Sequence, residues 1–160
     1  MTPRFEKAYN ALYNAFMNNT LAKGTCTACA VGNIVADALG GKVYKKGDEY
    51  KCDIHNGWWS KFFVTITNEQ EIKHKRADPD YWRLKKLTGY SIEELAKIEF
   101  AFETNTKIRY FRYDEHTEEQ IMEDQFRGLM AVMDVMIELD NIEEGRKYKE
   151  TFKNKFIHEY

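Results

Sequence analysis

The sequence has few residues that break a chain and no long apolar run. Only two prolines and nine glycines occur among 160 residues, so long linkers are not expected. The formal net charge of -2 excludes a uniformly basic nucleic-acid coat and permits only a local basic face. The longest apolar runs, such as 62–64, are too short to span a membrane. No apolar stretch follows residues 1–4, so we expect no secretory signal and a cytoplasmic location.

The composition predicts one globular domain over residues 1–160, with 43% hydrophobic and 31% charged residues. The apolar periodicity predicts about five helices, near residues 3–18, 29–40, 92–102, 118–139 and from 141 onward. Ser91 and Thr117 begin capping-box sequences ahead of two of them. Three short segments after the second helix, 42–45, 49–54 and 61–67, are typical of strands. The fold class is therefore a mostly helical α+β domain with a small antiparallel sheet.

Two further segments have weaker patterns. Residues 107–113 are compatible with a fourth strand, and the polar residues 68–86 predict a long loop or a short irregular helix.

The three cysteines and one histidine form two short-spaced pairs. Cys26 and Cys29 are separated by two residues, and so are Cys52 and His55. These are the ligand types and spacings of structural zinc sites. The sequence therefore predicts a Zn²⁺ ion held by all four side chains, tying the second helix to the sheet.

The Cys26 and Cys29 pair also permits thiol redox chemistry. It lies just ahead of a predicted helix, whose first amides and dipole lower the pKa of nearby thiols. Gly32 is unusual inside a helix, where it costs about 1 kcal/mol against alanine. Close packing of this helix against the first helix explains this glycine, or else Gly32 and Asn33 contact a ligand or partner beside the cysteines.

Basic residues gather in two segments, 73–86 and 146–155. The first segment has aromatic neighbours, and basic groups interleaved with aromatic rings suit single-stranded nucleic acid. Its candidate contact residues are Arg76, Tyr81, Trp82, Lys85 and Lys86. The alternative interpretation is two solvated faces.

Other catalytic signatures are not recognisable. No phosphate-binding loop, glycine-rich dinucleotide fingerprint or Ser-His-Asp order is present, so no nucleotide cofactor is expected. Glu99 and Glu103 lie four residues apart on a predicted helix, as do Glu119 and Glu123. We expect both pairs to belong to solvated helix faces.

Several segments resemble a family of small Bacteroidota and phage proteins with a Cys-x2-Cys-Ala-Val-Gly-Asn motif. The similar segments are 21–34, 89–99 and 128–132. The resemblance marks Cys26, Cys29, Gly32 and Asn33 as the signature and assigns them no chemistry; the pair Cys52 and His55 lies outside it. Proteins of this family often carry the name of one component of the sodium-translocating NADH-quinone reductase. That component needs flavin, NAD and ferredoxin domains, which 160 residues cannot hold.

The sequence thus favours a non-enzymatic binding or accessory protein stabilised by zinc. The resemblance implies a phage-encoded protein, whose compartment would be the host cytoplasm. We expect a protein partner and no membrane. Thiol redox chemistry at Cys26 and Cys29 is one alternative function, and nucleic-acid binding through residues 73–86 and 146–155 is another.

Overall fold

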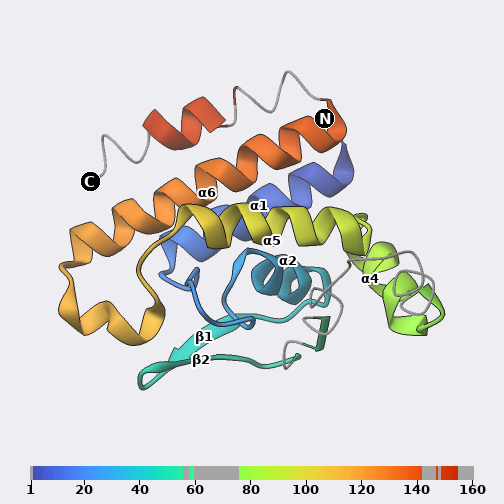
Figure 1. Ribbon diagram of the computed structural model, residues 1–160. Helices are drawn as coiled ribbons and strands as arrows, with labels where there is room; N and C mark the ends of the chain where they lie inside the picture. The colour runs from blue at the N-terminus through green and yellow to red at the C-terminus, as the bar shows by residue number, and fades with distance from the viewer. Residues whose placement is uncertain (1, 56–57, 60–75, 142–146, 148, 155–160) are drawn as a thin grey trace.

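Figure 1 shows the computed structural model, which describes residues 2–55, 58–59, 76–141, 147 and 149–154. Helices dominate it, and one short hairpin follows the second helix. In chain order the elements are α1 (Pro3–Met17), α2 (Ala30–Ala38), β1 (Val43–Lys46), β2 (Glu49–Cys52), α4 (Pro79–Thr88), α5 (Ile92–Asn105), the 3-10 helix η2 (Tyr110–Glu115) and α6 (Glu118–Asp140). The predicted mostly helical α+β architecture is confirmed.

The helices pack around one apolar core. α6 lies along α5 and α1, and α2 packs against α1, α4 and α5 (Figure 1). Helical packing of this kind buries one apolar stripe of each helix. Its largest fully buried side chains include Trp59, Tyr90, Phe5, Phe16, Phe102, Leu12 and Leu21. α2 therefore lies between other helices on one side and the hairpin on the other.

The helix starts follow the predicted capping pattern. The side chains of Ser91 and Thr117 each accept a hydrogen bond from the third helical amide, at 3.1 Å in both cases. Glu94 and Gln120 return bonds to the cap amides. Both capping boxes are therefore confirmed, and they fix where α5 and α6 begin.

The described sheet is a two-stranded antiparallel hairpin. Val43 pairs with Cys52, and Lys46 pairs with Glu49 across the turn. Gly47 has φ +63°, which favours glycine in so tight a turn. The strand predicted at 61–67 lies outside the described residues.

One prediction is wrong. Residues 107–113 do not form a strand. Asp124, which is buried, accepts bonds from the amides of Lys107 and Ile108 at 2.8–3.0 Å, and the chain then turns into η2. Only Arg109 forms an isolated bridge, with Lys23.

Of the two alternatives for 68–86, the helix is the one found: the later part of the segment is helical, and it is regular and continues to Thr88. Asp78 caps α4 by accepting from the Asp80 amide at 3.0 Å, and Pro79 occupies the first helical position. This Asp-Pro pair is a helix-start signal, because proline lacks the amide that a first helical turn leaves unpaired. The segment 68–75 lies outside the described residues.

The C-terminal region adds a helical turn to the core. Residues 149–154 are helical, and Phe152 packs its ring against Phe16 and Tyr13. Within the described ranges, no helix has the length and apolar character needed to cross a bilayer.

Candidate thiol site

The two cysteines ahead of α2 differ in exposure. Cys29 is the N-cap of α2 and is buried, whereas Cys26 is exposed. The Cys29 Sγ accepts a hydrogen bond from the Gly32 amide at 3.2 Å and donates one to the Cys26 carbonyl at 3.3 Å. The helix-terminal amide that we expected near Cys26 therefore bonds to Cys29. The exposed thiol of Cys26 thus lies three residues before the buried thiol of Cys29, whose sulfur is hydrogen-bonded to backbone groups of Cys26 and Gly32.

Gly32 lets the turn at residues 26–29, here called the cysteine turn, pack directly on α2. A Cβ at this position would lie 2.3 Å from the Thr27 carbonyl oxygen and 2.5 Å from that of Cys26. Both contacts are with backbone atoms, which cannot move aside as a side chain can. Gly32 is therefore closely packed, but its nearest neighbours are in the cysteine turn and not in the first helix, where the packing was predicted.

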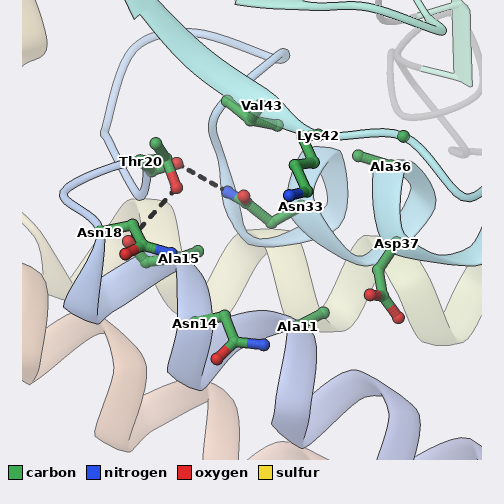
Figure 2. A pocket seen from close by; sticks show the side chains of 11 residues that line it. Ala11, Asn14, Ala15, Asn18, Thr20, Asn33, Ala36, Asp37, Lys42 and Val43 are labelled. Atoms are coloured by element: carbon green, nitrogen blue, oxygen red, sulfur yellow. Dashed lines mark hydrogen bonds between the residues drawn. The ribbon is translucent and has the colours of Figure 1, made fainter.

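Asn33 holds the same turn from the other side. Its amide nitrogen donates to the carbonyls of Thr20, Ala28 and Cys29 at 2.9, 3.1 and 3.0 Å. It also lines an open polar cavity between α1, α2 and the start of β1 (Figure 2). The volume of this cavity is about 260 Å³. The exposed polar side chains of that cavity are Asn14, Asn18, Asp37 and Lys42. Asn33 thus stabilises the cysteine turn by hydrogen bonds and also lines this polar cavity.

A smaller cavity of about 210 Å³ lies beside the thiols. α5 contributes Glu99 and Glu103 to its lining, and the cysteine turn contributes Cys26 and Cys29. Its described lining residues are Gly24, Thr25, Cys26, Cys29, Trp59, Glu99 and Glu103. The cavity therefore combines thiols and carboxyls with one large aromatic ring.

Glu99 connects α5 to the start of α2. Its Oε2 accepts a hydrogen bond from the Val31 amide at 3.3 Å. Burial raises the pKa of Glu99 to about 7, although a hydrogen bond with Cys29 lowers it, and the nearby Glu103 raises it further. Burial also raises the pKa of the Cys29 thiol well above its usual range, and the negative charge of Glu99 adds to this rise. The predicted solvated face is therefore wrong for Glu99, which is half-buried against a thiol.

Lys23 contacts the C-terminal end of α5, beyond Glu99. Its Nζ donates to the carbonyls of Glu103 and Thr106, the latter at 2.7 Å, and lies 3.7 Å from the Glu103 carboxylate. These bonds tie the C-terminal end of α5 to the segment that leads into the cysteine turn. They also partly neutralise Glu103.

The second predicted pair, Cys52 and His55, has different surroundings. Cys52 ends β2, half-buried, with its Sγ 3.8 Å from a carboxylate oxygen of Asp53. His55 Nε2 lies 3.0 Å from the Gly32 carbonyl oxygen, so this nitrogen is the donor. The His55 ring lies edge-on to Trp59 at 4.3 Å, and burial lowers the pKa of His55.

The four predicted zinc ligands all belong to the described residues. Within that part of the chain, no group of three or more Cys, His, Asp or Glu side chains is arranged to hold a metal ion. His55 Nδ1 and Trp59 Nε1 are buried and without a hydrogen-bond partner there. Zinc binding stays a prediction from the sequence pattern.

The basic segment on α4 is partly used for packing. Tyr81 is buried, and its hydroxyl donates to Glu93 at 2.5 Å. Arg76 lies 3.4 Å from the same carboxylate. Trp82 is 52% exposed, with its indole nitrogen bonded to the Arg76 carbonyl at 2.8 Å. The exposed positions on this helix are Pro79, Trp82, Arg83, Lys85 and Lys86.

In the described part of the second basic segment, 146–155, Lys149 pairs with Asp134 at 2.6 Å. Nucleic-acid binding through either segment stays a prediction.

Comparison with known proteins adds no further constraint. No family model, curated protein or solved structure matches the chain.

Proposed function

We propose that this protein carries out thiol–disulfide exchange at Cys26 and Cys29, with Glu99 as the proton acceptor for Cys29. One observation carries the proposal: an exposed thiol, a buried thiol and a half-buried carboxyl line one small cavity. A dithiol of this kind needs an accessible sulfur to attack and a second sulfur to resolve the intermediate. Cys26 is exposed and suits the attacking role, and Cys29 is buried behind it and suits the resolving role.

The first step would occur at Cys26. Its thiol releases a proton to solvent, and the thiolate attacks one sulfur of a substrate disulfide. A bond forms between Cys26 Sγ and that sulfur, and the substrate's own disulfide bond breaks. The first substrate thiolate leaves and takes up a proton from water. The product is a mixed disulfide at the exposed position.

The second step would release the substrate. Glu99 accepts the Cys29 proton, and the Cys29 thiolate attacks Cys26 Sγ. The Cys26–Cys29 disulfide forms while the mixed disulfide breaks, and the second substrate thiolate takes the proton back from Glu99. The dithiol has then lost two electrons and the substrate disulfide has gained them. A carboxyl with a pKa of about 7 suits this role, because a base works best near the operating pH.

Trapping tests the roles of the two cysteines. The reduced protein is mixed with hydroxyethyl disulfide and its adducts are identified by peptide mass mapping. Wild type should end as a Cys26–Cys29 disulfide, and Cys29→Ser should stop as a mixed disulfide at Cys26. Cys26→Ser should form neither product, whereas the matched control Cys52→Ser should behave as wild type. A wild-type adduct that persists at Cys26, or one confined to Cys52, would contradict the proposal.

Glu99→Gln separates a base from a mere charge. Loss of the negative charge lowers the pKa of Cys29, so a purely electrostatic role predicts faster resolution of the mixed disulfide. Loss of a proton acceptor predicts slower resolution, by about 100-fold. We expect the slower rate, measured by stopped flow after a mixing step that forms the adduct. Glu103→Gln, one helical turn away, is the matched variant and should change this rate far less.

A further inference from the structure

We infer that the polar cavity between α1, α2 and the start of β1 binds a small zwitterion of the α-amino-acid type. This site is separate from the exchange proposed at Cys26, because none of the residues that line it lines the thiol cavity. Polar side chains one turn apart on two helices, a buried amide oxygen and two opposite charges indicate the ligand.

Two helices present polar side chains to this cavity. Residues four apart lie on the same face of a helix, so α1 presents Asn14 and Asn18, and α2 presents Asn33 and Asp37. The other helical residues of the lining are buried alanines, whose short side chains leave a hollow. Figure 2 shows the polar side chains of both helices around it. The cavity therefore has a small apolar floor surrounded by hydrogen-bonding groups.

Asn33 offers the cavity a buried hydrogen-bond acceptor. Only 7% of this residue is exposed. Its Nδ2 donates to three carbonyl oxygens, so its Oδ1 is the side-chain atom that remains for a ligand. Among the described residues, none donates to this oxygen. A ligand N–H at Oδ1 would satisfy an acceptor in surroundings where hydrogen bonds are stronger than in water.

The cavity also has one charged side chain of each sign. Asp37 lies in the last turn of α2, and Lys42 lies just before β1. Within the described part of the chain, neither side chain has an ion-pair or hydrogen-bond partner; the Lys42 bond to Asp53 comes from its backbone amide. A neutral ligand would leave both charges unpaired, and a ligand of one sign would be repelled by one of them. A zwitterion pairs with both.

The placement of these groups sets the orientation of the ligand. The Asp37 carboxylate and Asn33 Oδ1 are acceptors on one face of α2, so the ammonium group of the ligand binds there. Its carboxylate binds the Lys42 ammonium group. At about 260 Å³ the cavity is smaller than the roughly 300–1,000 Å³ of pockets for drug-sized ligands. This volume suits a single amino acid and is too small for a peptide of several residues.

Three probes with one side chain and different charges test the inference. They are L-serine, a zwitterion, its methyl ester, a cation, and N-acetyl-L-serine, an anion. Binding to the reduced protein is measured by titration calorimetry at about pH 6, where the amino groups are protonated. L-serine should bind about tenfold more tightly than either blocked form, which has lost one charge-assisted bond. Equal affinities for the three probes, or no saturable binding of L-serine, would overturn the inference.

Variants show whether the two charges are the cause. Asp37→Asn should weaken L-serine binding about tenfold and abolish the preference over N-acetyl-L-serine, because the ammonium group has lost its partner. Lys42→Gln should instead abolish the preference over the methyl ester. Both residues are exposed, so we expect both variants to fold normally.

Glu119→Gln, an exposed position of α6, is the control and should bind all three probes as wild type does. A variant at Asp37 or Lys42 that weakens all three probes equally would mean that the cavity does not distinguish the two charges, and would overturn the inference. None of these outcomes bears on the exchange at Cys26, which is measured by its own adducts.

Discussion

The two cysteine segments have the same spacing but different surroundings. The turn at Cys26 and Cys29 is held by Asn33, packed on Gly32 and faced by Glu99. The segment of Cys52 ends a hairpin, and its sulfur lies near the carboxylate of the adjacent Asp53. Ligand types at a two-residue spacing therefore do not decide chemistry. What distinguishes the first pair is the helix α5, distant in sequence, that brings a carboxyl to it.

The two cysteine segments differ most at the glycines that pack beside them, Gly32 and Gly41. We expect the largest change in stability from substitutions there. Gly32→Ala would force a Cβ onto backbone atoms of the cysteine turn at 2.3–2.7 Å, so we expect a loss of about 4 kcal/mol in the free energy of unfolding. Gly41→Ala, near Cys52, would meet side-chain atoms of Ile54 and Asp53. These atoms move more easily, so a loss of about 1 kcal/mol is expected. Urea denaturation measures both, and equal losses would mean that the cysteine turn is not tightly packed.

The pH dependence of stability is the next largest effect. The pKa of Glu99 is about 7 in the folded protein and 4.5 when unperturbed, so the folded state binds this proton more tightly. The contribution of Glu99 to stability is therefore greatest below pH 4.5 and falls by about 3 kcal/mol as pH rises to 7.

Comparing the stability of wild type and Glu99→Gln across that pH range isolates this contribution. The two curves should diverge as pH rises, with the variant the more stable at neutral pH. Parallel curves would mean that Glu99 is solvated, as the sequence pattern had indicated.

His55 should show the opposite sign. Burial lowers its pKa, so the folded state binds this proton less tightly than the unfolded chain does. Its contribution to stability is present above pH 6.5 and is lost as pH falls toward the folded-state pKa. His55→Asn should therefore flatten a rise of stability with pH, the reverse of Glu99→Gln. A change of the same sign in both variants would contradict these assignments.

Side-chain clamps give the next contrast. Asn33→Ala removes three hydrogen bonds to carbonyls around the cysteine turn, and we expect a loss of about 2 kcal/mol. Asp53→Ala removes an exposed bond from the Lys42 amide, and about 0.5 kcal/mol is expected. Thermal unfolding of both variants at one pH tests the difference. A larger loss at Asp53 would make the Cys52 segment the more ordered of the two.

The smallest effect is expected from the residue that the zinc interpretation makes essential. His55→Ala should change the rate of Cys26–Cys29 disulfide formation by less than about threefold, because His55 touches the Gly32 carbonyl and neither thiol. Elemental analysis of wild type and this variant accompanies the measurement. About one zinc per chain, lost in His55→Ala together with a large change in thiol reactivity, would support the four-ligand site instead.

Much of the fold was predictable because it depends on local sequence. The boundaries of α5 and α6 follow from capping residues within three positions of each helix start, and the hairpin follows from its alternation and turn glycine. At 79–86 the polar composition left a loop and a short helix open, and the Asp78 cap with Pro79 at the first helical position decides for the helix. The prediction failed at 107–113, because the strand-like run is held by Asp124 from a later helix.

The candidate site was only half predictable for the same reason. Cys26, Cys29, Gly32 and Asn33 are neighbours in sequence, and their pattern marked them as candidate site residues. Glu99 looked like any exposed glutamate, since its spacing to Glu103 is also that of a solvated face. Its contact with the Val31 amide arises from the packing of α2 on α5, which no local pattern encodes.

The most direct test is to ask which cysteines become joined when the reduced wild-type protein is oxidised by a limiting amount of hydroxyethyl disulfide. Peptide mass mapping without reduction identifies the linked pair. The account predicts one dominant product, the disulfide between Cys26 and Cys29, with Cys52 still a free thiol. A product that links Cys52 to either of the other cysteines, or three thiols that remain reduced, would contradict it.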